Sequence, residues 1–235
     1  MASTLTQELL DPILRSDPAG PRVTYYDDAT GERVEVSTVT LANWAAKTAN
    51  LLRDEFGVEP GARVSVLLPA HWQTAAVLLG AWWAGADVTI GADDNAELAL
   101  VHGDRIEEAG DVPEILALSL DAFGKPVPNL PLGVTDYATS VRVHGDQFRP
   151  SGQLGALDST PVDEVLAAAR ARAEAHSLAV GDRVLSSLPW STADELIDGL
   201  LSVLVAGGSL VQVSNPDDSK TERRKSTEKI TATLG

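Results

Sequence analysis

A strand, helix, strand pattern of apolar positions begins at Arg63. The run Arg63–Leu68 is typical of a buried strand, and residues 73–84 are apolar almost all round, which predicts a helix packed on both sides. Gly85 fits the end of that helix, and Asp87–Ile90 resumes as a second strand. Because the helix has only about twelve residues, it is too short to span a bilayer, which needs about twenty. The segment is therefore predicted to be a right-handed β-α-β unit.

The same pattern returns 120 residues later in the chain. Gly61–Val64 corresponds to Gly181–Val184, and Leu68-Pro69 corresponds to Leu188-Pro189. After two inserted residues, Ser209–Val213 matches the second strand. The equal offsets favour two related subdomains, and the alternative is that any two β-α-β units look alike.

Other segments complete an α/β pattern. Periodicity, capping residues and turn residues predict helices over 4–15, 39–55 and 161–176, a hairpin of Arg22–Tyr26 with Arg33–Val36, and strands at Glu114–Leu118 and Thr139–Val143. Pro161 is expected in the first turn of its helix. We therefore predict an α/β fold of two similar parallel-sheet subdomains with flanking helices. The first comprises residues 1–130, with the N-terminal helix and the hairpin, and the second comprises residues 131–235, in one compact unit overall.

Charge and composition restrict the classes of partner. The chain has 18 basic and 34 acidic residues, and its net charge of −16 disfavours nucleic acids and anionic membrane surfaces. Half of that charge, −8, lies in residues 81–125. The absence of cysteine excludes disulfides, thiolate chemistry and cysteine-based zinc sites. Met1–Leu5 has no feature of a secretory signal, so we expect a cytoplasmic protein.

Motifs for common catalytic and metal sites do not occur in the sequence. The dinucleotide fingerprint, the Walker-type loop and the nucleophile elbow are all absent. The histidines have no metal-ligand spacing, so no metal site is expected, and each is interpreted as a surface or hydrogen-bonded side chain: His71, His102, His144 and His176. The sequence therefore excludes several enzyme classes without assigning an activity.

Eight short segments follow one another in a characteristic order: Val36–Leu41, Gly57–Val64, Leu68-Pro69, Ala84–Val88, Gly181–Leu185, Leu188-Pro189, Gly199–Leu201 and Ala206–Val211. In order and spacing they resemble the amino-terminal portion of the adenylate-forming superfamily, which includes acyl-CoA synthetases, luciferases and peptide-synthetase adenylation domains. The resemblance covers most of residues 20–213. It implies a large domain built from two similar α/β subdomains, in agreement with the internal repeat.

The resemblance also implies a phosphate-binding loop, rich in Ser, Thr and Gly and containing Pro-Lys-Gly, ahead of the helix at 161–176. In this chain the corresponding stretch is 147–156, and it keeps only three candidates for binding the cofactor ATP or AMP: Ser151, Gly152 and Gly155. No lysine occurs between Lys125 and Lys220. An arginine does not replace that lysine, because its planar fork is not a point ammonium.

The residues after Leu188-Pro189 depart from the superfamily in a second way. Members place an aromatic residue and a histidine there, near the carboxylate substrate, whereas this chain has Trp190, Ser191 and Thr192. We predict these three as substrate-binding residues, because open α/β sheets bind ligands at this edge, and packing of the tryptophan is the alternative.

The superfamily's adenine-binding strand, ribose-binding Asp and catalytic Lys would lie beyond Gly235. Without them the chain has few groups to stabilise a phosphoryl transition state, so no catalytic residue is assigned and autonomous adenylation is not expected. The leading hypothesis is a non-catalytic, stand-alone homologue that binds a nucleotide, an acyl or aryl group, or a protein partner. The alternatives are a ligase half completed by another subunit and an acidic interaction module whose contact face includes Asp93, Asp94 and Glu97.

Overall fold

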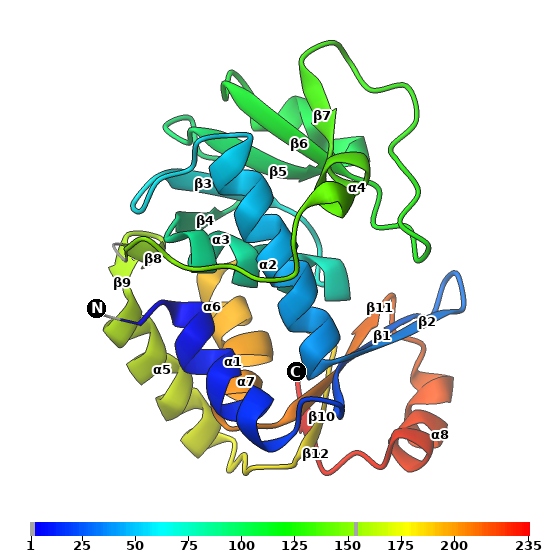
Figure 1. Ribbon diagram of the computed structural model, residues 1–235. Helices are drawn as coiled ribbons and strands as arrows, with labels where there is room; N and C mark the ends of the chain where they lie inside the picture. The colour runs from blue at the N-terminus through cyan, green and yellow to red at the C-terminus, as the bar shows by residue number, and fades with distance from the viewer. Residues whose placement is uncertain (1–2, 153–154) are drawn as a thin grey trace.

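Two sheets organise the chain in the computed structural model, which describes residues 3–152 and 155–235 (Figure 1). The larger sheet has the order β7-β6-β5-β3-β4-β8-β9 and the smaller one β12-β10-β11-β1-β2. The strands of the larger sheet are β3 Arg63–Leu67, β4 Asp87–Ile90, β5 Leu98–His102, β6 Glu114–Leu118, β7 Val134–Asp136, β8 Gly155–Leu157 and β9 Thr160–Pro161. Those of the smaller sheet are β1 Pro21–Asp27, β2 Glu32–Ser37, β10 Arg183–Ser186, β11 Ser209–Ser214 and β12 Ala232–Leu234. Neighbouring strands pair in parallel except in the edge pairs β1–β2 and β8–β9.

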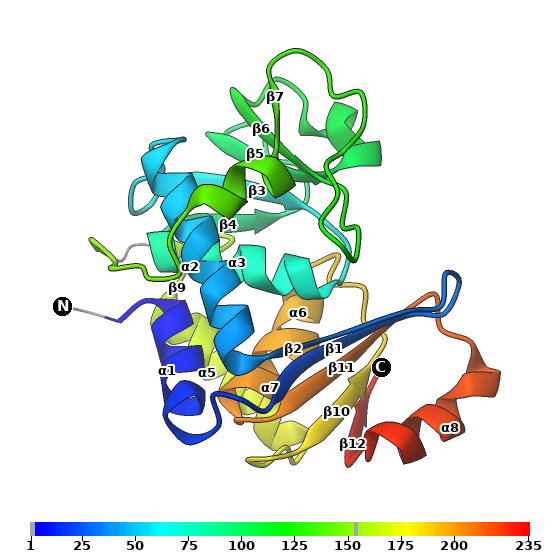
Figure 2. The ribbon, with the colours of Figure 1, turned by 45° about the vertical axis from the view of Figure 1, so that its right-hand side comes forward.

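Helices pack around the sheets and between them. They are α1 Leu5–Ser16, α2 Thr38–Asp54, α3 Trp72–Ala84, η1 Gly103–Ala109, α4 Tyr137–Ser140, η2 Val141–Val143, α5 Val162–Ala175, α6 Ala193–Leu196, the π-helical η3 Ile197–Leu201, α7 Ser202–Val205 and α8 Asp218–Glu228. Figure 2 shows α2 and α3 between the larger sheet and the strands β1 and β11. This central place explains why α3 is apolar all round: 12 of its 13 residues are buried.

The helices α2 and α3 approach each other closely at Gly80. A Cβ on Gly80 would lie 2.5 Å from the Cβ of Thr48 and 2.8 Å from the carbonyl oxygen of Ala45. Any larger residue at this position would therefore push the two helices apart.

The predicted α/β fold with parallel sheets and flanking helices is confirmed. The first repeat forms β3, α3 and β4, and the second forms β10, a helix broken into α6, η3 and α7, and β11, with parallel strands in each unit. The two sheets do not divide the chain at residue 130. Strands β7, β8 and β9 from beyond that residue join β3–β6, while the hairpin β1–β2 joins β10–β12.

Several local predictions are confirmed and two are wrong. Helix α1 begins with a capping box of Thr4 and Gln7, and the hairpin and the strand Glu114–Leu118 form as expected. The predicted strand Thr139–Val143 is instead helical, because the side chain of Asp136 accepts the N–H of Thr139 (2.7 Å) and starts α4. Pro161 is not in the first turn of α5 but at its N-cap, because Thr160 and Pro161 form β9.

Candidate functional site

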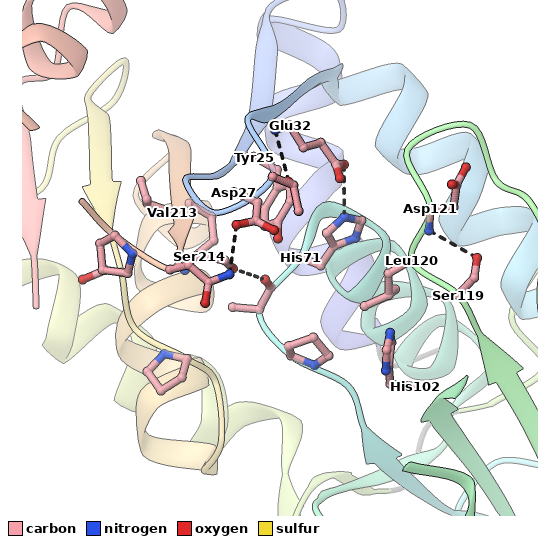
Figure 3. A pocket seen from close by; sticks show the side chains of 18 of the residues that line it. Tyr25, Asp27, Glu32, His71, His102, Ser119, Leu120, Asp121, Val213 and Ser214 are labelled. Atoms are coloured by element: carbon pink, nitrogen blue, oxygen red, sulfur yellow. Dashed lines mark hydrogen bonds and ion pairs between the residues drawn. The ribbon is translucent and has the colours of Figure 1, made fainter. Parts of the chain in front are cut away.

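A cavity of about 1020 Å³ lies where the carboxyl ends of the two sheets meet. The segments that follow β3, β6, β10 and β11 contribute Pro69–His71, Ser119–Asp121, Ser187 and Asn215, and the hairpin contributes Tyr25, Asp27 and Glu32. Figure 3 shows Asp27 and Ser214 on one side of His71, with Ser119, Leu120 and Asp121 on the other. Ligand sites of open α/β sheets lie at carboxyl strand ends, and this volume is large enough for a drug-sized molecule.

The two sheets are tied together beside this cavity by the two Leu-Pro segments. The backbone N–H of Ala70, which follows the first segment, donates a hydrogen bond to the carbonyl oxygen of Pro189 in the second (3.2 Å). The hydroxyl of Ser214 at the end of β11 bonds the carbonyl oxygen of Ala70 (3.3 Å). The equivalent turns of the two repeats therefore meet and form one wall.

His71 is the most enclosed titratable group of the cavity wall, with a side chain only 3% exposed. It caps α3, because its Nδ1 accepts the N–H of Gln73 (3.1 Å), and its ring packs edge-on against Tyr25 with the ring centroids 4.2 Å apart. In the neutral ring the proton is therefore on Nε2, which faces Oε1 of Glu32 at 3.7 Å. Burial lowers the pKa of His71 despite the nearby Glu32 carboxylate, so the imidazole is neutral at pH 7.

The opposite side of the cavity is a turn that packs on α3. Leu120 has a left-handed backbone (φ 55°), and the hydroxyl of Ser119 accepts the N–H of Asp121 (3.2 Å). The side-chain amide of Gln73 donates to the carbonyl oxygen of Asp121 (3.0 Å). Asp121 also lies 3.9 Å from the ammonium of Lys125. This turn is therefore held by α3 and by its own side chains.

The predicted substrate residues Trp190, Ser191 and Thr192 lie next to this cavity but do not line it. Trp190 adopts φ 58° and is 1% exposed, with its indole nitrogen against Gly199 rather than in the cavity. Ser191 and Thr192 begin α6: the Ser191 N–H donates to the carboxylate of Glu195 (2.7 Å), and the Thr192 hydroxyl accepts the Glu195 N–H (3.2 Å). Their polar groups thus serve the start of a helix.

The predicted cofactor residues are in another part of the molecule. Ser151 is exposed, Gly152 packs on the ring of Pro60, and Gly155 begins β8, while Gln153 and Leu154 lie outside the described residues. Pro60 precedes the amino end of β3, so the structure does not bring Ser151 and Gly152 to the cavity or to Trp190. Ser151 and Gly152 also precede strand β8 instead of following it.

The turn at Asp158 and Ser159 joins β8 to β9, the short strand that runs directly into α5. Both residues have left-handed backbones, with φ 47° and 62°. The N–H and the hydroxyl of Ser159 contact the carboxylate of Asp87 (3.0 and 3.1 Å). Two carboxylates at this place disfavour a phosphate group.

Sequence reasoning missed His71 and Glu32 as site residues. The available signal for His71 was its place just after Leu68-Pro69, at a predicted strand end. In the described part of the chain, no group of three or more His, Cys, Asp or Glu side chains is arranged to hold a metal ion. Within the same residues, no helix has the length and apolar character that crossing a membrane requires.

Three comparisons place the chain among known proteins. No protein-family model matches the sequence. A Mycobacterium tuberculosis (strain ATCC 25618 / H37Rv) protein described as a TIGR03089 family protein is 55% identical over 240 residues, which cover 99% of this chain and 98% of that protein.

Solved acyl-CoA synthetases share the fold. The structure is similar to that of Brucella canis acyl-CoA synthetase (TM-score 0.79, 18% identity) and to that of a Mycobacterium tuberculosis fatty acyl CoA synthetase (TM-score 0.75, 15% identity). In both cases 98% of this chain is covered but only 47% and 48% of the synthetase. The chain therefore spans about half the length of these enzymes.

Proposed function

The chain belongs to the TIGR03089 protein family, and from this premise and the cavity between its sheets we propose that it is a non-catalytic homologue of the amino-terminal half of an adenylate-forming enzyme that binds a small organic ligand. The similarity to half of two acyl-CoA synthetases supports the kinship of the fold. The cavity at the carboxyl ends of both sheets is the observation that carries the binding function.

The turn at Asp158 and Ser159, which lies ahead of α5, supports the non-catalytic part of the proposal. Adenylate formation needs cations or backbone donors directed at the phosphates of ATP. Here Ser159 is already bonded to Asp87, and Asp158 adds a second carboxylate. This turn therefore carries groups that a polyphosphate would avoid.

A ligand screen with a blocked cavity tests the binding function. Thermal unfolding is followed with small organic cations, neutral molecules and anions, including ATP, AMP and an acyl-adenylate analogue. Stabilising compounds are then titrated into Thr30→Trp, which places an indole at an exposed position of the cavity lining, and into Ala29→Trp as a control in the same turn. We expect binding to be lost in Thr30→Trp and kept in Ala29→Trp.

Three results would contradict the proposal. Binding that survives Thr30→Trp, or a complete lack of stabilising compounds, would remove the cavity as a ligand site. Substrate-dependent exchange of pyrophosphate into ATP by the purified chain would show that it is an enzyme.

The half-length match supports a second candidate function, in which another subunit supplies the missing half of a ligase. In that case the chain purified from its own cells should carry a partner, and the mixture should catalyse pyrophosphate exchange that neither component shows alone. Recovery of the chain by itself, without exchange activity in the cell extract, would rule this candidate out.

A further inference from the structure

The charged groups of the cavity between the sheets do not balance. Its lining has three carboxylates, Asp27, Glu32 and Asp121, one lysine, Lys125, and two histidines, His71 and His102. Lys125 lies beside Asp121 and offsets it. The two remaining carboxylates are both on the hairpin β1–β2, and His71 is held neutral as described above.

Asp27 is ionised and is held by neutral donors. Its carboxylate accepts hydrogen bonds from the amide of Asn215 (2.9 Å) and from the N–H of Ala29 (2.9 Å). Partial burial alone would raise the pKa of Asp27, but these hydrogen bonds bring it below its ordinary value. Among the residues that the structure describes, no lysine or arginine forms an ion pair with Asp27; the nearby cations Lys220 and Arg224 pair with Asp28 instead.

Glu32 also has no cationic partner within residues 3–152 and 155–235. Its Oε1 is buried and has no hydrogen-bond partner, since the Nε2 of His71 at 3.7 Å is too distant for a hydrogen bond and is itself unpartnered. Gln212 adds a third acceptor, because its Oε1 is buried without a partner while its amide nitrogen donates to Leu188 (3.0 Å). An unpaired buried acceptor destabilises the protein, so a ligand that supplies donors would bind favourably here.

The remaining surface of the cavity suits the body of an organic molecule. Tyr25 packs on His71, and Leu120 and five prolines provide apolar walls: Pro69, Pro126, Pro128, Pro189 and Pro216. A cation beside an aromatic face gains a further attraction from the ring quadrupole. An anion would instead approach two carboxylates that no protein cation neutralises.

We propose that this cavity selects an organic ammonium ion, a protonated amine on an apolar or aromatic body, whose N–H groups donate to Glu32, Asp27 and Gln212. This inference rests on the ligand-binding function proposed above and names the chemical class of the ligand. It differs from what the resemblance to adenylate-forming enzymes implies, which is a carboxylate and a nucleotide.

Three probes of one size and different charge test the selection. At pH 7, 2-naphthylmethylamine is a cation, 2-naphthylmethanol is neutral and 2-naphthoate is an anion, and each is titrated calorimetrically into the whole chain. We expect the amine to bind at least tenfold more tightly than the alcohol, and the naphthoate to bind most weakly. Added salt should weaken binding of the amine and leave the alcohol unchanged.

Variants that remove one charge test whether Glu32 and Asp27 cause the preference for the cation. Glu32→Gln should weaken binding of the amine about tenfold and change binding of the alcohol by less than twofold, and Asp27→Asn should act in the same direction if Glu32→Gln does not fold. The matched control is Glu97→Gln, which removes the same charge from an exposed residue outside the cavity lining. Thermal unfolding of each variant shows whether the fold is kept.

The outcomes separate this inference from the proposed function. If the alcohol or the naphthoate binds as tightly as the amine, and Thr30→Trp blocks that binding, the selection for cations is wrong and the binding function stands. If Glu97→Gln weakens binding of the amine as much as Glu32→Gln does, the proposed selection for cations is likewise wrong. If none of the three probes binds and the wider screen finds no ligand, both fail.

Discussion

The two β-α-β units share a sequence pattern but differ in what surrounds them. The first unit has a continuous helix, α3, which lies between the sheets and is buried on all sides. The second has a helix broken by the π-helical η3, with the acidic residues Asp194, Glu195 and Asp198 in its first half. After equivalent Leu-Pro segments, one unit buries His71 in the wall of the cavity and the other turns Trp190 away from it. The segment after Leu-Pro thus forms a polar wall of the cavity in the first unit and packs a tryptophan in the second.

The largest expected difference concerns the buried tryptophan of each unit. Trp82 in the first donates its indole N–H to the carbonyl oxygen of Ala156 (2.5 Å), whereas the indole nitrogen of Trp190 has no hydrogen-bond partner among the described residues. Trp82→Phe should lower the free energy of unfolding by about 3 kcal/mol, because it removes volume and leaves a buried carbonyl unpaired. Trp190→Phe should lower it by about 1 kcal/mol, because only volume is lost. Urea unfolding measures both, and equal costs would show that the hydrogen bond contributes nothing.

The glycines of the two helices give the next comparison. Gly80→Ala should destabilise by about 2 kcal/mol, because the added methyl group meets Thr48 and the backbone of Ala45. Gly199→Ala should cost about 1 kcal/mol, because the neighbouring atoms belong to the side chains of Trp190 and Leu188, which are able to shift. Thermal unfolding measures both destabilisations. A larger loss of stability in Gly199→Ala than in Gly80→Ala would contradict the close approach of α2 and α3.

The equivalent arginines of the two units differ in their own exposure and in whether they share their partner. The Arg63 side chain is 42% exposed and pairs with Asp93 (2.7 Å), whereas the Arg183 side chain is 14% exposed and shares Glu228 with Arg33. Burial alone would raise the pKa of Glu228, but hydrogen bonds from Tyr26, Arg183 and Arg33 lower it from 4.5 to about 2. The stabilisation is therefore complete above about pH 4.5 and is lost as the pH falls towards 2, a loss of about 1–2 kcal/mol after allowance for solvent screening.

Substitution of each arginine by methionine sharpens this test. Arg183→Met should flatten the acid part of the stability curve. Arg63→Met should change that part less, because the backbone N–H of Asn95 is the main group that lowers the pKa of Asp93. The measurement is urea unfolding at pH 2.5 to 7. A curve that is equally steep in both variants would show that Glu228 does not control acid stability.

The smallest effect concerns the residues that cap the two helices. Thr192→Ala should cost about 1 kcal/mol, and Thr192→Ser should restore most of it. His71→Asn should lower the free energy of unfolding by about half as much. The asparagine side chain still has an oxygen that can accept the N–H of Gln73, which His71 Nδ1 accepts in the native protein. Thermal unfolding checks these values, and a larger loss in His71→Asn would show that packing of the ring on Tyr25 outweighs the cap.

The fold was predictable from the sequence to a large extent, because its signals are local. The apolar run of α3, the hairpin turn and the capping box at Thr4 each depend on residues only a few positions apart. The short helix at Thr139–Val143 was missed because β-branched residues favour strands, and a single contact from Asp136 decided otherwise.

The candidate site was much less predictable, because its groups come from distant parts of the chain. Glu32 and His71 approach each other only because the hairpin joins the smaller sheet and α3 lies between the sheets. The sequence placed Trp190 correctly at a strand end, but not the direction of its ring, which depends on a left-handed backbone and on the space above Gly199. Site residues Ser151, Gly152 and Gly155 stay predictions without a ligand contact to support them.

The pairing of β1 with β11 has a consequence for synthesis of the chain on the ribosome. Val23 pairs with Leu210, so one edge of the β1–β2 hairpin stays unpaired until a strand roughly 190 residues further along the chain has been synthesised. At a typical rate of about 5–20 residues per second, that interval is on the order of ten to forty seconds. The strands of the larger sheet all come from residues 63–161 and are complete well before that strand is made. A nascent chain therefore passes through a stage in which all strands of the larger sheet have been synthesised while one edge of β1 is still unpaired.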